Sequence, residues 1–440
     1  MADPASAAAA RIPPLNCGRR ATMSWAFYDW ANSAFAAVVM AVFFPLFFKD
    51  YASVGADAAL TIRRLGDANA LGSLLIVLLA PVLGAIADRG GAKKRFLVFF
   101  AFIGMVTTAG LFFVEKGAWE IAAALYILGV IGFSGSNIFY DSLLMSVADE
   151  RKVDFVSGLG YALGYLGGGL LLAASIWMVR WPDAFGLEDA HEAMKVAFVA
   201  VGAWWAVFTV PLLLFVREPT TGVRQGVAAV AAGFRQLAAT FREVRRLRVV
   251  MVFLLAYWLY IDGVDTIVRM AAVYGRTLGF GMDDIALAFL ITQFIGFPAA
   301  IAYSKMGEKI GLKPAIFIGL GVYVGVCVWG YVMRSVWEFY AIAVAVGLVQ
   351  GGVQALSRSF YTRIIPADKA GEFFGFYNML GKFAAVLGPL MMGWVSVATG
   401  NPRYSILTVI VLFVAGAVFL ARVDEAEGRR MASALERDDV

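Results

Sequence analysis

Residues 96–114, FLVFFAFIGMVTTAGLFFV, form an apolar stretch without a single charged side chain. Its length matches the roughly 20 residues that an α-helix needs to cross about 30 Å of hydrocarbon. The stretch does not alternate between apolar and polar residues, as a strand of a membrane β-barrel would. It therefore predicts a membrane-spanning helix.

Similar stretches recur along the whole chain of 440 residues, of which 61% are hydrophobic and 16% charged. Ordinary soluble domains carry about 25% charged residues, so this chain has too few charges to cover the surfaces of two or three soluble domains. The pattern instead predicts an all-α membrane protein with twelve transmembrane helices. The predicted spans are 23–48, 68–87, 96–114, 119–147, 154–180, 194–216, 249–273, 284–304, 314–333, 336–362, 372–398 and 404–421.

Lysine and arginine are distributed unevenly between the two sides of these spans. With the N-terminus inside, 25 of them lie on inner segments, 9 on outer loops and 3 within spans. Positive residues concentrate in the cytoplasmic loops of membrane proteins. We therefore expect both termini in the cytoplasm. The net charge is +5, and its excess of positive residues lies in the inner segments. This distribution indicates membrane orientation and not nucleic-acid binding.

The spans fall into two sets of six around a polar, arginine-rich stretch. This order predicts an N-terminal arm over 1–22, a six-helix bundle over 23–216, a basic cytoplasmic linker over 217–248, a second six-helix bundle over 249–422 and a cytoplasmic tail over 423–440. The arm lacks the apolar core of a cleaved signal peptide. The linker is expected to be partly helical and to lie on the membrane surface.

Three short matches, in chain order, relate the two halves at offsets of 233, 220 and 217 residues. Loops of unequal length explain the drift, and an internal duplication explains the order. Two parallel halves with a central site between them are a known plan for transporters. The matches are Asp29-x-x-Asn32-Ser33 with Asp262-x-x-Asp265-Thr266, Asp88-x-x-Gly91-x-Lys93 with Glu308-x-x-Gly311-x-Lys313, and Gly135-x-Asn137-x-x-x-Asp141-Ser142 with Gly352-x-Gln354-x-x-x-Arg358-Ser359.

Seven charged residues lie inside the predicted spans and away from their ends, where each costs at least about 2.5 kcal/mol on insertion scales. They occur only on spans 1, 4, 7, 10 and 11, which predicts that these helices line a polar pathway. Several stand three or four residues from another polar residue and so share a helix face. The mixed lining favours a small zwitterionic or polar solute. The candidate substrate- or proton-binding residues are Asp29, Asn32, Asn137, Asp141, Asp262, Asp265, Arg269, Gln354, Arg358, Asn378 and Lys382.

Structural ion pairs are the alternative explanation for the same residues. Arg358 aligns with Asp141 across the repeat and could pair with it, and Asp265 could pair with Arg269. For Asp29 and Asp262 we favour a functional role, because the repeat relates them and both stand on aromatic-flanked spans. Both explanations stay open for Lys382.

The stretch from Gly84 to Arg95 joins the second and third predicted spans and contains Asp88, Arg89, Gly91 and Lys93. A tight cytoplasmic turn needs glycine, an acidic residue can cap a helix, and the cations hold the loop inside. A phosphate-binding loop is excluded, because the stretch follows no strand and lacks Gly-Lys-Ser/Thr. Glu308, Gly311 and Lys313 repeat the pattern in the second half.

This loop resembles the signature of the major facilitator superfamily, in which it is associated with gating. Further stretches resemble a branch of that superfamily, the vacuole effluxer-like family of autophagy-associated transporters and their bacterial relatives. The chain departs from the pattern by carrying Asp141 and Asp265 where asparagine is expected. The matching stretches are Ser24-Trp-Ala-Phe-Tyr-Asp-Trp-Ala-Asn-Ser-Ala-Phe35, Asn137-Ile-Phe-Tyr140, Gly160-Tyr-Ala-Leu-Gly-Tyr-Leu-Gly-Gly168, Asp262-Gly-Val-Asp-Thr266, Gln354-Ala-Leu-Ser-Arg-Ser359 and Gly371-Glu-Phe-Phe-Gly-Phe-Tyr377.

The resemblance implies a major facilitator fold, a multi-pass protein of a bacterial inner membrane and, by analogy with fungal members, amino-acid efflux. From the residues we expect a monomeric secondary transporter that works by alternating access, is coupled to protons or another ion, and is not an enzyme. Asp262 with Asp265 is the expected proton-carrying pair, because buried like charges favour protonation. The alternatives are an exporter of drug-like compounds, a lipid-handling protein and a non-transporting sensor.

No cofactor or metal is expected, since neither a nucleotide-binding loop nor a cluster of histidines and cysteines is present in the sequence. The single histidine, His191, falls in a predicted outer loop and is expected to be solvated. Cys17 in the arm and Cys327 inside a span are expected not to form a disulfide.

Overall fold

Every element of the described chain is a helix. The structure is a computed structural model. It describes residues 18–55, 64, 67–68, 71–72, 74–76, 92–149, 151–218, 247–367, 369–383, 387–399 and 401–438. Within these residues, 10 helices are long and apolar enough to cross a membrane. Most of the predicted second span and most of the predicted linker lie outside the described residues.

The first half of the chain forms one group of helices. Its first span runs unbroken from Arg19 to Ala52 and includes two stretches with the wider turns of a π-helix. The elements are α1 (Arg19–Ala34), η2 (Phe35–Phe43), α2 (Phe44–Phe47), η3 (Phe48–Ala52), α4 (Lys93–Gly110), η4 (Leu111–Phe113), α5 (Trp119–Val147), α6 (Val153–Arg180), η5 (Pro182–Phe185) and α7 (Ala190–Phe215).

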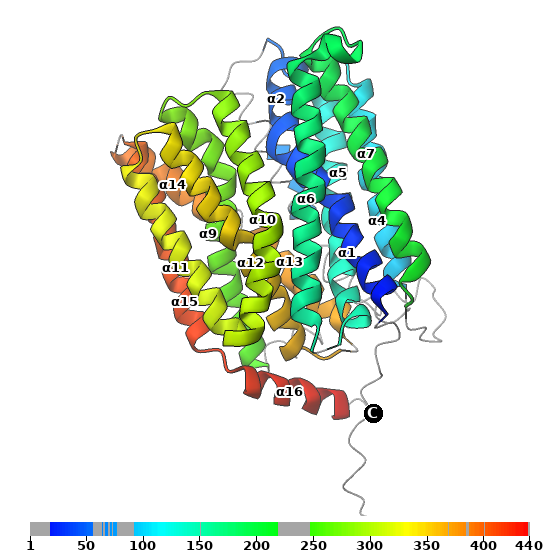
Figure 1. Cartoon of the computed structure of the whole chain (residues 1–440), viewed down its shortest axis with the longest axis vertical. Helices are drawn as coiled ribbons and strands as arrows, with labels where there is room; N and C mark the ends of the chain where they lie inside the picture. The colour runs from blue at the N-terminus through cyan, green and yellow to red at the C-terminus, as the bar shows by residue number, and fades with distance from the viewer. Residues whose placement is uncertain are drawn as a thin grey trace, which may run out of the picture.

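The second half forms a group beside the first (Figure 1). The predicted span 372–398 is not a single described helix but two, with residues 384–386 between them outside the description. The elements are α9 (Arg248–Thr277), α10 (Met282–Ile310), α11 (Leu312–Val332), α12 (Val336–Ile364), α13 (Ala370–Phe383), α14 (Leu387–Thr399), α15 (Pro402–Ala421) and α16 (Glu425–Asp438).

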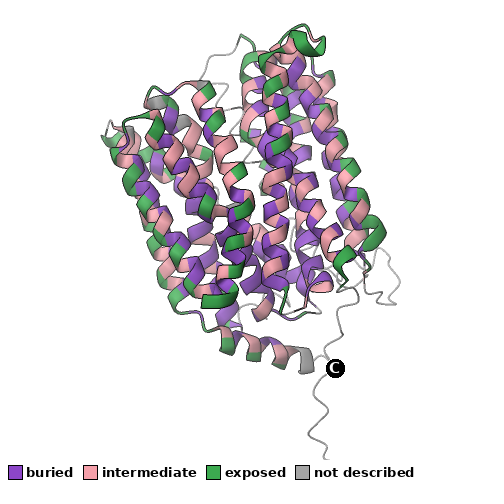
Figure 2. Ribbon diagram, viewed as in Figure 1, coloured by how far each residue is buried: buried purple, intermediate pink, exposed green. Residues whose placement is uncertain are grey.

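Buried apolar side chains form two separate clusters. One draws its buried members from residues 21–216, and the other draws them from residues 247–423. Two cores, each built within one half of the chain, allow the halves to move as units. Much of the ribbon where the halves meet is also buried, above all towards α16 (Figure 2). We call this end of the molecule, where α1 begins and α15 ends, the α16 end, and the opposite one the far end.

Glycines let α6 approach α1 closely. A Cβ atom at Gly164 would stand 2.5 Å from Ser33 Oγ, and one at Gly167 would stand 2.6 Å from the Trp30 carbonyl oxygen. Such contacts are too short for any larger residue. Small residues at helix interfaces are the usual means of tight packing in membranes. This packing sets α6 directly against the polar face of α1.

Candidate functional site between the two halves

Arg358 on α12 reaches across the interface between the halves and is only 2% exposed. Its Nη1 lies 3.0 Å from Asp141 Oδ1 on α5 and 3.7 Å from Asp29 Oδ2 on α1. Its Nε donates to Ser157 Oγ and its Nη2 donates to the Ser157 carbonyl oxygen, both at 2.9 Å. One side chain of the second half therefore binds three helices of the first.

Aromatic rings surround this guanidinium. Its carbon lies 4.4 Å from the ring centre of Tyr161, 5.0 Å from that of Trp25 and 5.6 Å from that of Tyr140. Trp25 stacks on Tyr140 at 4.3 Å and donates its indole N–H to the Tyr140 carbonyl oxygen at 2.9 Å. The Tyr140 hydroxyl donates to Asp29 Oδ2 at 2.8 Å. Cation–π contacts add to the ion pairs in this desolvated setting.

Asp141 is held on both of its oxygens by the second half. Asn378 on α13 donates to Asp141 Oδ2 at 3.1 Å, while Arg358 occupies Oδ1. A second polar contact joins α1 to α5 within the first half, where Asn32 donates to Asn137 Oδ1 at 2.6 Å. Removing one partner of a buried ion pair costs about 3–5 kcal/mol, because it leaves a charge without compensation. The cluster thus ties the two halves together strongly.

Asp262 on α9 lies outside this cluster. It is fully buried and accepts hydrogen bonds from the backbone N–H groups of Leu387 and Gly388, at 3.1 and 2.9 Å. Thr266 donates to it at 3.2 Å. Leu387 and Gly388 are the first described residues of α14, so the carboxylate joins α9 to the backbone of α14. Asp29 and Asp262, both predicted to line the polar pathway, therefore belong to two separate clusters.

The repeat-related aspartates nevertheless share one feature, which is a glycine of their own half packed against the carboxylate. A Cβ at Gly160 on α6 would stand 2.7 Å from Asp29 Oδ2, and one at Gly388 would stand 2.9 Å from Asp262 Oδ1. In both halves a larger residue would displace the carboxylate. The glycine-rich stretch from Gly160 and the Gly-Pro pair at 388 thereby acquire a specific role beside the acid.

The remaining candidates on α9 are less buried than Asp262. Asp265 is half-buried and lies within electrostatic reach of tyrosines of both halves, such as Tyr161 on α6 and Tyr257 on α9. Arg269, one turn further, is exposed. Gln354 is half-buried. The side chain of Lys382 lies outside the described part of the chain.

The predicted gating loops are described only in part. Gly84, Asp88, Arg89 and Gly91 lie outside the described residues. The Lys93 backbone N–H donates to Glu218. Gly311 has φ +93°, a left-handed conformation that favours glycine, and Glu308 is exposed.

One lysine in each half binds the end of a helix from its own half. Lys94 Nζ donates to the carbonyl oxygens of Leu213 and Val216, at 2.8 and 2.6 Å. Lys313 Nζ donates to those of Ala421 and Val423, at 2.7 and 2.8 Å. Cations are favourable at helix C-termini. The repeat aligns Lys93 with Lys313, but the contact that corresponds to that of Lys313 is made by the neighbouring Lys94.

Tyr140 and Ser157 belong to the Arg358 cluster but were not predicted as site residues. Tyr140 stands in the stretch Asn137-Ile-Phe-Tyr140, so its neighbourhood was visible as a motif. Ser157 gave no signal, because a serine near the start of a glycine-rich helix is unremarkable until its partner is known. Only the packing of α6 on α12 reveals its role.

The arrangement of helices in two halves is similar to that of solved major facilitator transporters. The proton:xylose symporter XylE superposes with a TM-score of 0.73 at 15% identity, over 94% of this chain and 98% of its own. The human organic anion transporter MFSD10 superposes with a TM-score of 0.69 at 15% identity, over 91% and 99% of the chains. These likenesses show that the chain has the fold of the major facilitator superfamily.

Its family follows from sequence comparison. The family described as "Vacuole effluxer Atg22 like" matches residues 68–433, and the chain belongs to this family. An uncharacterized MFS-type transporter, YxiO of Bacillus subtilis, is 38% identical over 91% of this chain and 94% of its own length. Autophagy-related protein 22 of Saccharomyces cerevisiae (strain S288c) is 23% identical over 94% and 93% of the chains. The resemblance stated from the sequence is confirmed.

Proposed function

We propose that this protein is a secondary transporter that moves a small polar or zwitterionic solute by alternating access, with the Arg358 cluster as the contact that opens and closes. The observation that carries the proposal is the ion pair between Arg358 and Asp141 across the two halves. A rigid structural lock would serve as well with apolar residues, which often stabilise more than a buried ion pair. Ionic groups can instead be exchanged for water or solute when the halves part.

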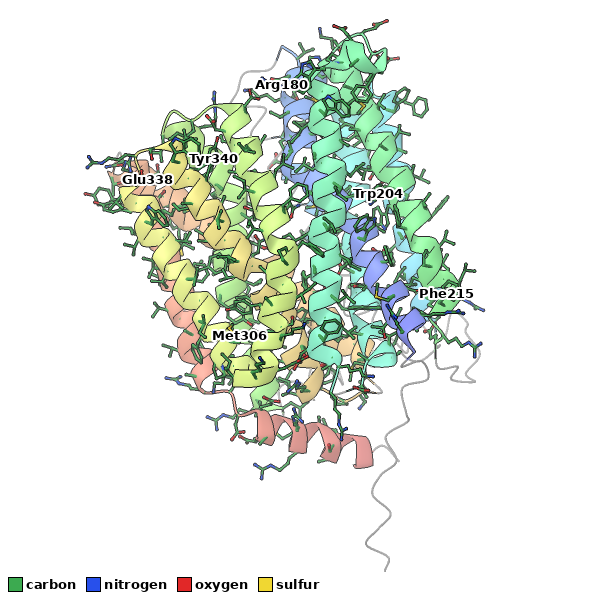
Figure 3. All side chains as sticks on the ribbon, in the orientation of Figure 1. Arg180, Trp204, Phe215, Met306, Glu338 and Tyr340 are labelled. Atoms are coloured by element: carbon green, nitrogen blue, oxygen red, sulfur yellow. The ribbon has the colours of Figure 1, made fainter. Side chains whose placement is uncertain are left out.

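The two ends of the interface differ, which supports a defined state in the cycle. At the α16 end the inter-half contacts are buried and ionic. At the far end, Arg180 Nη1 pairs with Asp283 Oδ2 at 2.6 Å, but their side chains are 53% and 81% exposed. Exposed pairs contribute about 0–1 kcal/mol. Arg180 is seen at that end in Figure 3. The α16 end is therefore the closed one.

The excess of lysine and arginine on inner segments assigns the α16 end to the cytoplasm. The described state is then closed to the cytoplasm, in what we take to be the inner membrane of a bacterium. We propose coupling to protons, with carboxylates as carriers. Asp29 and Asp141 share Arg358, so a proton on either one would weaken its hold on the cation and release the other half.

Candidates for the solute follow from the less buried charges of α9. Asp265 and Arg269 on α9 offer a carboxylate and a guanidinium one helical turn apart, which suits a molecule bearing both charges. Amino-acid efflux is one form of this function, consistent with a family described by its vacuole effluxers. The protein is proposed to act as a monomer and without a cofactor.

The experiment has two stages. The purified protein is screened by thermal shift against amino acids, sugars, peptides and nucleosides, and each hit is then tested as a radiolabelled solute in proteoliposomes with an imposed pH gradient. We expect a hit to be moved by the gradient and to lose that movement in Arg358→Met. Proteoliposomes that move none of these solutes under any gradient contradict the proposal.

A further inference from the structure

A second ionic cluster joins the two halves at the α16 end, nearer to the surface than Arg358. Arg363 lies in the last turn of α12, and its Nη2 pairs with Asp154 Oδ2 at the start of α6. Ser359 Oγ donates to the other oxygen of Asp154. The Asp154 side chain is 4% exposed and that of Arg363 is 16% exposed. The contact is therefore largely shielded from water.

The same guanidinium also binds the C-terminal helix. Its Nη1 lies 3.2 Å from Glu425 Oε1, at the first residue of α16. Glu425 is held in turn by Arg429 Nη2 at 2.6 Å, one turn along α16. A chain of alternating charges thus runs from Arg429 through Glu425 and Arg363 to Asp154. It begins on α16 and ends in the opposite half.

The described apolar contacts of α16 are with the second half, on α12 and α9. Val423 and Ala432 are buried, and Met431 and Leu435 pack against the core of that half. A Cβ at Gly428 would stand 2.7 Å from Ile364 Cγ2. Ile364 follows Arg363 directly and is the last residue of α12. The helix therefore moves with the second half, and within the described residues the Arg363 chain links it to the first half.

We propose that Arg363 is a gating residue and that α16 is a latch that holds it across the interface. Glu425 draws the guanidinium from one side while Asp154 binds it from the other. Loss of Glu425 leaves Arg363 free to turn towards water and weakens its hold on the first half. Since the latch lies outside the Arg358 cluster, it must release before that cluster is reached from the α16 end. The proposal rests on the proposed alternating access.

The test measures the opening of the α16 end directly and needs no solute. Spin labels at exposed positions of the two halves, introduced by Arg95→Cys and Lys309→Cys in a Cys17→Ser background, report their separation by double electron–electron resonance in nanodiscs. Cys327 is buried and stays in place. Glu425→Gln is compared with Glu427→Gln, which makes the same change at an exposed residue of the same helix.

We expect Glu425→Gln to raise the ratio of open to closed molecules about fivefold, as the loss of a partly exposed ion pair predicts, and Glu427→Gln to match the parent. Removal of residues 424–440 should open the α16 end at least as far, and it serves as the second variant. Raised salt should open the parent more than Glu425→Gln. Equal distance distributions in the parent, Glu425→Gln and the truncation overturn the latch. A latch that responds in a protein that moves no solute would refute the transport function and not the latch.

Discussion

Arg358 and Asp141 stand 217 residues apart, at positions that the internal repeat makes equivalent, and they form an ion pair with each other at 3.0 Å. Equivalent residues of two halves can touch only near the axis that relates the halves. The pair therefore lies close to that axis, towards the α16 end of the interface. A position on this axis is where parallel-repeat transporters place their sites.

Replacing Arg358 by methionine should leave Asp29 and Asp141 buried without their cation. We expect the free energy of unfolding to fall by about 3–5 kcal/mol and gradient-driven transport to be lost. The measurements are the thermal unfolding midpoint in detergent and flux in proteoliposomes. The matched control is Arg334→Met at an exposed position, which should behave as the parent does. Parent-like stability and flux in Arg358→Met would show that the cluster is dispensable.

Gly160→Ala tests the contact between α6 and Asp29 with a single methyl group. The new Cβ would stand 2.7 Å from Asp29 Oδ2 and 2.9 Å from the Tyr140 hydroxyl. We expect overpacking to cost about 1–3 kcal/mol and to reduce transport, because the carboxylate is pushed off its position. Gly321→Ala on α11 is the control, since nothing lies within 4 Å of a Cβ there. Equal effects of the two changes would reject a specific role for Gly160.

Asp262→Asn separates the charge of this residue from its hydrogen bonds. The amide oxygen can still accept from the start of α14, so we expect an assembled protein in which gradient-driven uptake or efflux is abolished. Asp262→Ala removes the acceptor as well and should cost a further 1–3 kcal/mol or so. Asp183→Asn, at an exposed site, is the control. Unchanged flux in Asp262→Asn would leave Asp262 with a structural role alone.

Lys94 and Lys313 offer a test of the repeat. Each binds carbonyl groups at the end of the last span of its own half, so replacement by methionine should lower the free energy of unfolding by about 1 kcal/mol. Because the two sites lie in separate halves, the double variant should show the sum of the two effects. Unfolding in detergent gives the measurement, with exposed Lys116→Met as the control. A large effect of one lysine and none of the other would contradict their equivalence.

Much of the fold could be predicted, because apolar length and the count of charges leave few options for a chain that must satisfy its backbone within lipid. The stretch 96–114 is an example, since α4 and η4 cover it almost completely. Over the predicted span 372–398 the structure describes α13 and α14, and residues 384–386 between them lie outside the described part. The end of the chain was predicted as a plain tail, although its periodic apolar residues form α16 and dock on α12 and α9.

The charged residues of the site could be predicted from the cost of placing a charge in a membrane span, but most of the contacts between them could not. Arg358 and Asp141 were predicted because charged residues inside membrane spans are costly and usually functional, and the repeat suggested that they could pair. Asp154 and Arg363 lay at the ends of predicted spans, where charged residues are ordinary. Their contact depends on how α6 packs against α12 across the interface. Spacing along one chain carries no information about that packing.

The most direct measurement is proton movement in proteoliposomes loaded with a pH-sensitive dye, after addition of each solute identified by the thermal-shift screen. We expect at least one solute to drive proton movement with the parent and with Arg334→Met, and none with Arg358→Met or Asp141→Ala. Equal proton movement in all four proteins would show that the Arg358–Asp141 contact does not open and close during transport.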